Sequence, residues 1–381
     1  MLQTPRGSGR AVQKLSDDTS EKAGDAIMTG GSLFSGLGAF DLAFQRAGYR
    51  ILWQVEKDKS CQRVLEQHWP DVPKHDDVRT FHGTDAAIPD VIFGGSPCQD
   101  WSVAGKRAGL AGARTGLFFE FVRVVDEIAP QWLLFENVPG LLSACSCRRC
   151  HGLRSQFKPV PRSHRGRDFA TVLGEITGFV PEVPTKGWRN SGICCGPKRA
   201  ACWRVFNSQY DGVAQRRRRV FLIASSGDWG DPSRVLFEPN SLPGDPAPGT
   251  REWKEAARPI ERGIGEDSFG ITVVQAAKPI ICRERIRDSG PVIYHQENLA
   301  YSLDAPVAGG GRPQMTITSL AVRRIMPIEA LRLMALPDDW LDLDPPLSDS
   351  KKYRMIGNAG VANTVQWIAE RIRMVHESRK S

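Results

Sequence analysis

Residues 89–99 read Pro-Asp-Val-Ile-Phe-Gly-Gly-Ser-Pro-Cys-Gln, an apolar run that ends in a glycine-rich turn. The apolar residues 91–93 predict a short buried strand, and the glycines predict a loop after it. In an α/β sheet such a loop lies at the carboxyl edge, where these folds place their chemistry. Cys98 stands at that edge behind Pro97, which restricts the backbone before it. A lone cysteine is more often a small buried residue, so the rest of the chain has to decide its role.

Strand and helix patterns alternate on both sides of this stretch. A helix over 58–68 begins at Asp58, a side chain suited to an N-cap. Such repeated βα units predict a doubly wound, mostly parallel sheet. The expected strands are residues 31–34, 51–55, 91–93, 132–135 and 220–224, and the other expected helices are residues 41–47 and 117–128.

Local composition and hydrophobic pattern divide the sequence into four expected segments. Residues 1–27 form a polar tail, and 28–224 form the main α/β domain. Residues 225–318 are dense in Gly and Pro and predict a smaller, irregular, β-rich domain. Residues 319–381 return to the main domain and end in a helix. One face of that helix carries apolar residues three or four positions apart, namely Val361, Val365, Ile368, Ile372 and Val375.

Bulk properties narrow the class of protein. The 381 residues carry a net charge of +8, with arginines clustered at 162–167, 216–219 and 283–287. Such clusters suit phosphate contacts, so a nucleic acid is a candidate partner. The nine cysteines are an odd number, which favours a reducing compartment over a disulfide framework. No apolar run reaches the roughly 18 residues of a membrane span, and no secretory signal opens the chain, so we expect a cytoplasmic protein.

A glycine turn near the start suggests a nucleoside cofactor. Residues 34–39 read Phe-Ser-Gly-Leu-Gly-Ala and join an expected strand to an expected helix. Glycines allow a ligand to approach the backbone, and the helix adds amide donors. Glu56 follows about twenty residues later, where an acid commonly binds ribose hydroxyls. These residues alone leave a nicotinamide and an adenosyl cofactor both open.

Four motifs in a fixed order resemble the cytosine-5 DNA methyltransferases of bacterial restriction-modification systems or phages. They are Phe34 to Gly38, Gly94 to Gln99, Glu136-Asn137-Val138 and Gln215 to Arg219. The resemblance implies S-adenosylmethionine as cofactor on a Rossmann-like fold, with 225–318 as a target-recognition domain that reads duplex DNA. It also implies these cofactor-binding positions: Phe34, Gly36, Gly38, Glu56, Asp77, Val78, Pro97, Leu117, Asn358 and Val361.

The same resemblance implies a catalytic set. Cys98 would add to carbon 6 of cytosine, which makes carbon 5 nucleophilic enough to accept a methyl group. Glu136 would donate a proton or hydrogen bond at ring nitrogen 3. Arg219 would bind the base carbonyl, and Arg217 would support it through the base or a nearby phosphate. Asn137 would brace the loop.

Chemistry on a cytosine ring requires the base to leave the duplex stack, so we expect base flipping. The glycine-containing loop 99–114 is expected to close over the flipped base. Double-stranded DNA is the expected partner, next to a cognate restriction endonuclease, for a monomeric, nucleoid-associated enzyme. The expected DNA-contacting residues are Gln99, Ser102, Lys106, Arg107 and Gln215.

A cysteine-rich insertion over residues 143–202 is harder to interpret. Four of its cysteines, Cys145, Cys147, Cys150 and Cys194, are candidate ligands of a structural zinc ion. The spacing Cys-x-Cys-x-x-Cys-His departs from that of a paired zinc ribbon, so free thiols in a basic loop are the favoured interpretation.

Three rival functions remain at this point. The same residues could methylate cytosine in transfer RNA, although the long segment 225–318 favours duplex DNA. A dinucleotide-dependent oxidoreductase would use the glycine turn and Glu56 but leaves Cys98 and Glu136 unexplained. A non-catalytic DNA-binding relative would keep the fold, and the intact catalytic residues argue against it.

Overall fold

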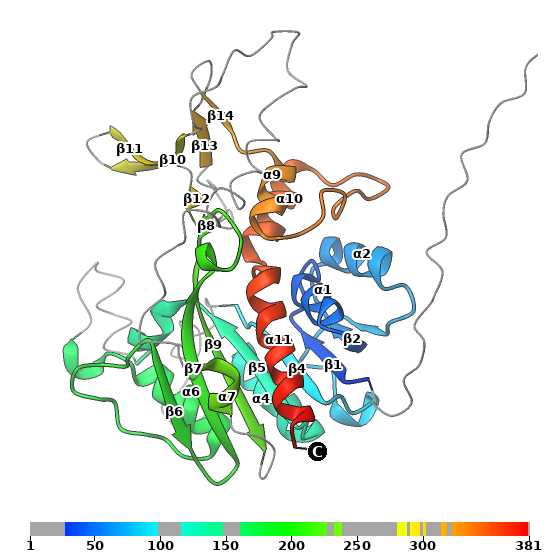
Figure 1. Cartoon of the computed structure of the whole chain (residues 1–381), viewed down its shortest axis with the longest axis vertical. Coiled ribbons are helices and arrows are strands. Elements are labelled where there is room, and N and C mark those ends of the chain that lie inside the picture. The colour runs from blue at the N-terminus through cyan, green and yellow to red at the C-terminus, as the bar shows by residue number, and fades with distance from the viewer. Residues whose placement is uncertain are drawn as a thin grey trace, which may run out of the picture.

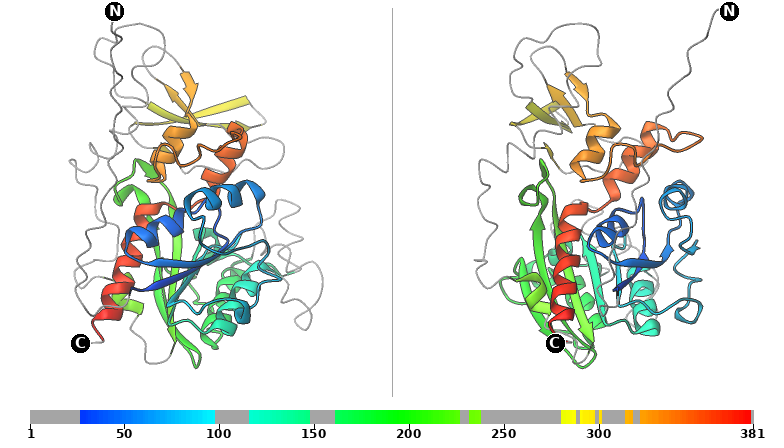
Figure 2. Two further views of the ribbon diagram at one scale, coloured as in Figure 1. Left: turned by 90° about the vertical axis from the view of Figure 1, so that its right-hand side faces the viewer. Right: turned by 45° about the vertical axis from the view of Figure 1, so that its right-hand side comes forward.

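The computed structural model describes residues 27–97, 116–147, 161–226, 232–237, 280–287, 290–297, 300–301, 314–317 and 322–379. These residues form a central eight-stranded sheet with helices on both faces, and a smaller antiparallel sheet at one end of the molecule (Figures 1 and 2). The strands of the central sheet are β1 (Thr29–Leu33), β2 (Arg50–Val55), β3 (Lys74–His75), β4 (Val91–Gly94), β5 (Trp132–Asn137), β6 (Ser191–Cys195), β7 (Arg199–Asn207) and β9 (Arg218–Ser226). The helices are α1 (Ala39–Arg46), α2 (Lys59–His68), α4 (Leu117–Ile128), α6 (Arg167–Thr177), α7 (Pro232–Leu236), α9 (Pro327–Leu333), α10 (Asp349–Asn358) and α11 (Ala362–Glu377), with short 3-10 turns η1 (Gly83–Asp85), η2 (Pro139–Ser143), η3 (Arg162–His164) and η4 (Ser208–Tyr210).

The strand order of the central sheet is β3-β2-β1-β4-β5-β9-β7-β6. The strands from β3 to β5 pair in parallel, whereas β9, β7 and β6 join by antiparallel pairing. The prediction of a doubly wound α/β fold is therefore confirmed, and the sheet itself is mixed. The parallel half places the carboxyl ends of β1, β4 and β5 at one edge.

Alternate residues of the central strands belong to two separate hydrophobic cores, one on each face. On β5, Leu134 packs into the core that holds α1 and α11, while Leu133 and Phe135 pack into the core that holds α4 and α6. This period of two is what a strand covered on both faces requires. The result is a three-layer α/β/α arrangement.

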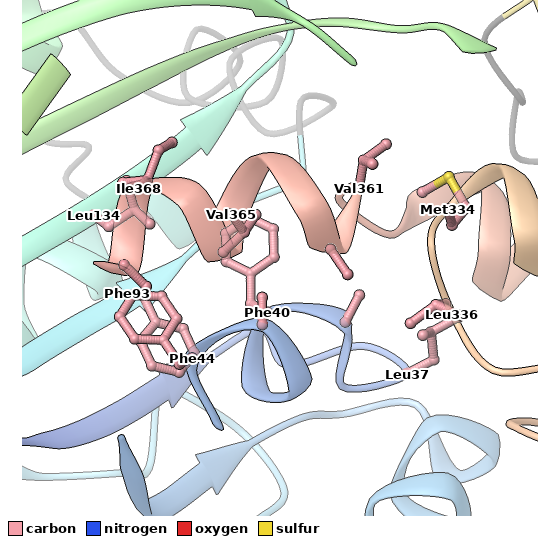
Figure 3. Packing of buried hydrophobic residues seen from close by; sticks show 14 of the residues in the cluster. Leu37, Phe40, Phe44, Phe93, Leu134, Met334, Leu336, Val361, Val365 and Ile368 are labelled. Atoms are coloured by element: carbon pink, nitrogen blue, oxygen red, sulfur yellow. The ribbon is translucent and has the colours of Figure 1, made fainter. Parts of the chain in front are cut away.

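The C-terminal helix α11 packs against α1 of the central α/β unit, and the domain boundaries expected from the sequence stay a prediction. The buried residues Val361, Val365 and Ile368 share one core with α1, and Val365 points toward Phe40 of that helix (Figure 3). In the same core Phe44 of α1 stacks on Phe93 of β4 with 4.0 Å between ring centroids. The Tyr49 hydroxyl donates a hydrogen bond to the carbonyl of Ala369 at 3.0 Å. Residues more than 300 positions apart in sequence thus share one core.

Part of the predicted cysteine-rich insertion belongs to the central sheet. Within residues 143–202, the helix α6, the strand β6 and the first residues of β7 are regular elements. Trp203 of β7 packs edge-on against Phe169 of α6, with ring centroids 5.1 Å apart. The strands β6 and β7 extend the sheet beyond β9. These parts of residues 143–202 therefore belong to the central fold and are not an inserted loop.

The smaller sheet is antiparallel, in the order β11-β10-β13-β14. Its strands, and the two-residue strands β8 and β12 that pair in parallel beside it, are β8 (Gln215–Arg216), β10 (Ile280–Arg287), β11 (Gly290–Glu297), β12 (Ala300–Tyr301), β13 (Gln314–Ile317) and β14 (Val322–Arg324). The strand character of this segment is consistent with a second β-rich domain, whose boundaries stay a prediction.

Local sequence signals account for several element boundaries. Asp58 caps α2, because its Oδ1 accepts hydrogen bonds from the amides of Ser60 at 2.8 Å and Cys61 at 3.4 Å. Helix α4 has the predicted limits, residues 117–128. Among the residues described above, no helix combines the length and the apolar character needed to cross a bilayer.

Asp41 in α1 is a carboxylate with no exposure to solvent. Its Oδ2 accepts a hydrogen bond from Ser32 Oγ at 3.1 Å, and its Oδ1 accepts one from Gln54 Nε2 at 2.9 Å. These bonds join α1 to β1 and β2. Burial raises the pKa of Asp41 to about 6, and the two hydrogen bonds offset only part of that effect.

We predict that Asp41→Asn changes the pH dependence of stability. Because the folded-state pKa exceeds the ordinary value of 3.8, Asp41 stabilises the fold fully below pH 3.8, and this contribution is lost as pH rises through 6. Relative to wild type, the free energy of unfolding of Asp41→Asn should therefore rise by about 1.4 kcal/mol between about pH 5 and about pH 8 in urea denaturation. Asp71→Asn is the control at an exposed carboxylate, and a pH-independent difference for Asp41→Asn would contradict the prediction.

Candidate active site

A cavity of about 610 Å³ lies at the carboxyl ends of β1, β4 and β5. The turn between α10 and α11 forms another part of its wall. This volume is in the range of small-molecule and cofactor sites. The predicted residues that line it are Phe34, Gly36, Glu56, Asp77, Val78, Pro97, Leu117, Asn358, Glu136, Arg217 and Arg219.

The glycine turn after β1 leaves room for a ligand at Gly36. Its φ of 57° is left-handed, and a Cβ placed there would meet only the Phe34 carbonyl, at 4.0 Å. Gly38 differs, because a Cβ there would lie 2.5 Å from the Trp69 ring, and Gly38 does not line the cavity. Gly38 is therefore required by packing and by its φ of 83° at the start of α1. Its predicted cofactor contact is not supported.

Glu56 fixes the same turn from β2. Its Oε2 accepts a hydrogen bond from the Gly36 amide at 2.8 Å, and its Oε1 accepts one from the Asp58 amide at 2.7 Å. Burial raises the pKa of Glu56, and the two amide hydrogen bonds partly offset this. Each carboxylate oxygen retains a further acceptor position, which two ribose hydroxyls can use.

The loop after β4 passes extremely close to its neighbours. A Cβ at Gly94 would lie 2.1 Å from the Leu33 carbonyl oxygen, and a Cβ at Gly95 would lie 2.8 Å from Glu136 Oε2. Asn137 Nδ2 donates a hydrogen bond to the carbonyl of Ser96 at 3.1 Å, as the bracing role of Asn137 predicts. The loop therefore runs against the catalytic candidate Glu136. The next predicted residues, Cys98, Gln99, Ser102, Lys106 and Arg107, lie outside the described residues.

Glu136 and Arg219 form an ion pair on the cavity wall. Arg219 Nε lies 2.9 Å from Glu136 Oε1, and both side chains are mostly buried. The pair joins the end of β5 to the beginning of β9, which are adjacent antiparallel strands. A second Arg219 bond, from Nη1 to the Arg218 carbonyl at 2.8 Å, fixes the guanidinium further. The structure thus brings two of the predicted catalytic side chains together.

Arg217 points to a different partner from the one predicted. Its side chain is buried, and Nη2 donates hydrogen bonds to the carbonyls of Gly357 at 3.1 Å and Ala359 at 2.6 Å. These carbonyls belong to the turn between α10 and α11, which also lines the cavity. Arg217 therefore positions the C-terminal wall of the site. A phosphate contact is incompatible with this burial, while a contact with the base stays a prediction.

Two other predicted residues lie elsewhere than expected. Gln215 is completely buried, and its side-chain oxygen and nitrogen have no hydrogen-bond partner among the described residues. The side chain of Gln215 is thus not on the surface in this structure, and its DNA contact stays a prediction. Val361 does not line the cavity and instead packs in the core behind α1. Its apolar character fits this packing role as well as the predicted one.

Cys61 lines the cavity, but its environment does not favour reactivity. Cys61 in α2 is buried. Burial raises the pKa of the Cys61 thiol, and the nearby carboxylates of Glu56 and Asp58 raise it further. A thiol held in the protonated form is a poor nucleophile, so Cys61 does not compete with Cys98 for that role.

The predicted zinc ligands separate into two places. Cys145 and Cys147 lie together with His164, a residue that the cysteine spacing did not indicate. Cys194 lies on β6, where its Sγ is 3.9 Å from Thr177 Oγ1, and it is not part of that group. Cys194 is therefore not a partner of the other two, and Cys150 lies outside the described residues.

Residues 28–158 and 261–374 match the family of C-5 cytosine-specific DNA methylases. The chain belongs to this family. The prediction from the motifs is thereby confirmed, and the family assigns to this methylase the methylation of cytosine in DNA, with S-adenosylmethionine as methyl donor. The oxidoreductase alternative is excluded.

Two relatives match the chain to different extents. The methylase is 26% identical over 353 residues to the Type II methyltransferase M.HhaI of Haemophilus parahaemolyticus, covering 89% of this chain and 92% of that protein. It is also 34% identical over 251 residues to the DNA N-6-adenine-methyltransferase of Escherichia phage P1, covering 60% of this chain. That match spans only 32% of the phage protein, so the activity in its name is not transferred to this chain.

A solved structure supports the fold alone. The methylase superimposes on the crystal structure of the S. pombe Dnmt2 methyltransferase with a TM-score of 0.55 and 13% identity, covering 93% of this chain and all of that one, 100%. The mixed central sheet is therefore that of a known methyltransferase structure.

We predict that Arg217→Lys weakens cofactor binding. A lysine ammonium is a compact donor on a shorter side chain and lacks the planar guanidinium that holds Nη2 between the two carbonyls, and each hydrogen bond to a charged group contributes about 1.5–3 kcal/mol. The turn between α10 and α11 should loosen, lower the melting temperature and raise the Kd for S-adenosylmethionine by up to about tenfold. Calorimetric titration measures the Kd.

The exposed neighbour supplies the control for this prediction. Arg216→Lys makes the same chemical change at a side chain that contacts only Gln209 Oε1, at 3.4 Å, among the hydrogen bonds of the described residues. It should leave both the Kd and the melting temperature unchanged. Equal effects from the two variants would contradict a specific role for Arg217.

Proposed function

We propose that this methylase transfers a methyl group to carbon 5 of a flipped-out cytosine in duplex DNA, through a covalent adduct with Cys98. The observation that carries this proposal is the ion pair of Glu136 with Arg219, which stands against the loop that leads to Cys98. Pro97, the last described residue of that loop, lines the same cavity as Glu136. One cavity can therefore hold the cofactor and the target base side by side.

The cavity residues suit S-adenosylmethionine. The open space at Gly36 and the free acceptor positions of Glu56 fit an adenosyl ribose close to the β1 turn. Asp77 and Val78 would face the adenine, and Leu117 and Asn358 would close the remaining walls. When bound, S-adenosylmethionine supplies an electrophilic methyl group on a sulfonium, which carbon 5 of the activated cytosine accepts.

The residues of the chain would divide the cytosine chemistry among them. The Cys98 thiolate adds to carbon 6, and the electrons of the carbon 5–carbon 6 double bond become available at carbon 5. Glu136 donates a proton or hydrogen bond to ring nitrogen 3, where negative charge develops, while Arg219 holds the ring carbonyl and orients Glu136. After methylation, a base, either water or hydroxide or a side chain, removes the carbon 5 proton, and departure of the Cys98 thiolate from carbon 6 restores the aromatic ring.

Duplex DNA is the proposed substrate because of the family and because of the length of the segment between β9 and α9. A base inside a duplex cannot reach a cavity at the sheet edge, so the enzyme must flip it out. The β-rich segment containing β10 to β14 is the proposed reader of the DNA sequence. A cytoplasmic, nucleoid-associated monomer and a cognate restriction endonuclease stay predictions.

We predict that Cys98→Ser abolishes methylation and leaves cofactor binding intact. A serine hydroxyl is a much weaker nucleophile than a thiolate, so transfer of tritiated methyl groups to DNA should fall at least about 10³-fold. Cys195→Ser, a change at an exposed cysteine of β6, is the control and should retain activity. Full activity of Cys98→Ser would refute the covalent mechanism.

Trapping extends this test to the adduct itself. With DNA that carries 5-fluorocytosine at the target position, carbon 5 cannot lose fluorine as it loses a proton. The wild-type enzyme should therefore stay covalently attached, and Cys98→Ser should not. Bisulfite sequencing of methylated genomic DNA would then give the target sequence, whereas label found in transfer RNA and not in DNA would favour the RNA alternative.

We predict a different kinetic pattern for Glu136→Gln. The glutamine keeps the size of the side chain but cannot donate an acid proton, so kcat should fall by about 10²–10⁴. The Kd for S-adenosylmethionine should change little, because Glu136 is proposed to act on the base. If cofactor affinity fell in parallel with kcat, Glu136 would be a structural residue of the cavity instead.

A further inference from the structure

Three side chains that could bind a metal lie close together in the segments after β5, the strand that carries Glu136. None of the three lines the cavity described above. Cys145 and Cys147 follow the turn η2, which directly succeeds Glu136-Asn137-Val138, and His164 ends η3. The two sulfur atoms and a ring nitrogen of His164 all lie within 4.8 Å of one another. Cys145 is buried, and the other two side chains are partly exposed.

The spacing of these atoms fits a tetrahedral zinc site. Zinc binds thiolate sulfur at about 2.3 Å and imidazole nitrogen at about 2.0–2.1 Å, so ligands on one ion lie roughly 3.5–3.8 Å apart. Cys147 Sγ and His164 Nδ1 are already 3.3 Å apart, and the third ligand atom lies within the stated 4.8 Å of both. Small side-chain rotations would bring all three to one ion.

The backbone around the cysteines is held by a second layer of hydrogen bonds. The carboxylate of Asp168 accepts bonds from the amide and the hydroxyl of Ser146, both at 2.8 Å. The amides of Gly166 and Asp168 donate to the Ala144 carbonyl at 3.1 and 3.3 Å. The residues on both sides of Cys145, Ala144 and Ser146, are thus tied to the start of α6. Outer contacts of this kind orient metal ligands and raise affinity.

The donor set selects the class of metal. Two thiolates and an imidazole are soft or borderline ligands, which suit zinc and do not suit magnesium or calcium. We propose that Cys145, Cys147 and His164 bind a structural Zn²⁺ ion. Binding displaces one proton from each thiol, so two protons leave and the two thiolate charges neutralise the ion. A water molecule or a further protein ligand completes the fourth position.

The ion would connect two segments of the described chain that are distant in sequence. One is the turn that carries the chain away from Glu136, and the other leads into α6. A metal at this point closes the loop between residues 147 and 164, and it holds the turn η2 against α6. The site is structural, because its ligands do not line the cavity. If the zinc proposal proves wrong, the proposed methyl transfer is therefore unaffected.

The first test is the metal content of the full-length chain. The protein is expressed in zinc-supplemented medium, purified without chelator and analysed by atomic emission, with Cys147→Ala and His164→Ala beside it. Wild type should contain about one zinc ion per chain, and both variants should lose most of it. The control Cys195→Ala removes an exposed cysteine of β6 outside the group and should keep the ion. Absence of zinc from wild type, or equal zinc in all four proteins, would overturn the proposal.

A second measurement covers variants that fail to fold. Replacing zinc by Co²⁺ in the wild-type chain should give a thiolate-to-metal charge-transfer band, and His164→Cys should strengthen that band by adding a third thiolate. Chelator should abolish the band and lower the melting temperature of wild type. A cobalt spectrum without thiolate bands would exclude the assigned ligands even if the protein bound metal elsewhere.

Discussion

The active site depends on the lack of space beside Gly94 and Gly95. Their backbone passes so near the Leu33 carbonyl and the Glu136 carboxylate that no side chain fits at either position. This contact fixes how β4 leaves the sheet and places the loop toward Cys98 against the acid of the next strand. Asn137 then holds Ser96, so the end of β5 both supplies the acid and supports the loop. A shift of either strand would disturb both features together.

Charge is distributed around the cavity in a way that serves both ligands. Behind the cofactor turn stand two buried carboxyl groups, Asp41 and Glu56, whose pKa values burial raises. Each is retained because it accepts hydrogen bonds that no apolar residue could accept. On the opposite wall, Arg219 offsets the charge of Glu136, and Arg217 meets backbone carbonyls of the C-terminal turn. Positive charge is thus placed where a cytosine carbonyl and developing negative charge would lie.

Sequence patterns predicted the features that depend on neighbouring residues. The cap at Asp58, the limits of α4 and the buried face from Val361 to Val375 all arise from local periodicity or capping. Long-range contacts were not predictable in the same way. His164 is 17 residues from Cys147, and only the fold of η3 brings the two together. The burial of Gln215 and the carbonyl contacts of Arg217 likewise depend on segments more than 80 residues away in sequence.

The strand β5 connects the two hydrophobic cores, the acid Glu136 and the cysteine group. Its residues pack into both cores, its end carries Glu136, and the turn after it leads to the cysteine group. A strand buried on both faces has little freedom to slide, so an acid at its end is held rigidly. Among the described residues between β5 and α6, only the short turns η2 and η3 follow, and neither is a strand of the sheet that could give such support. A metal ion at Cys145, Cys147 and His164 would supply that support at the point where the sheet stops providing it.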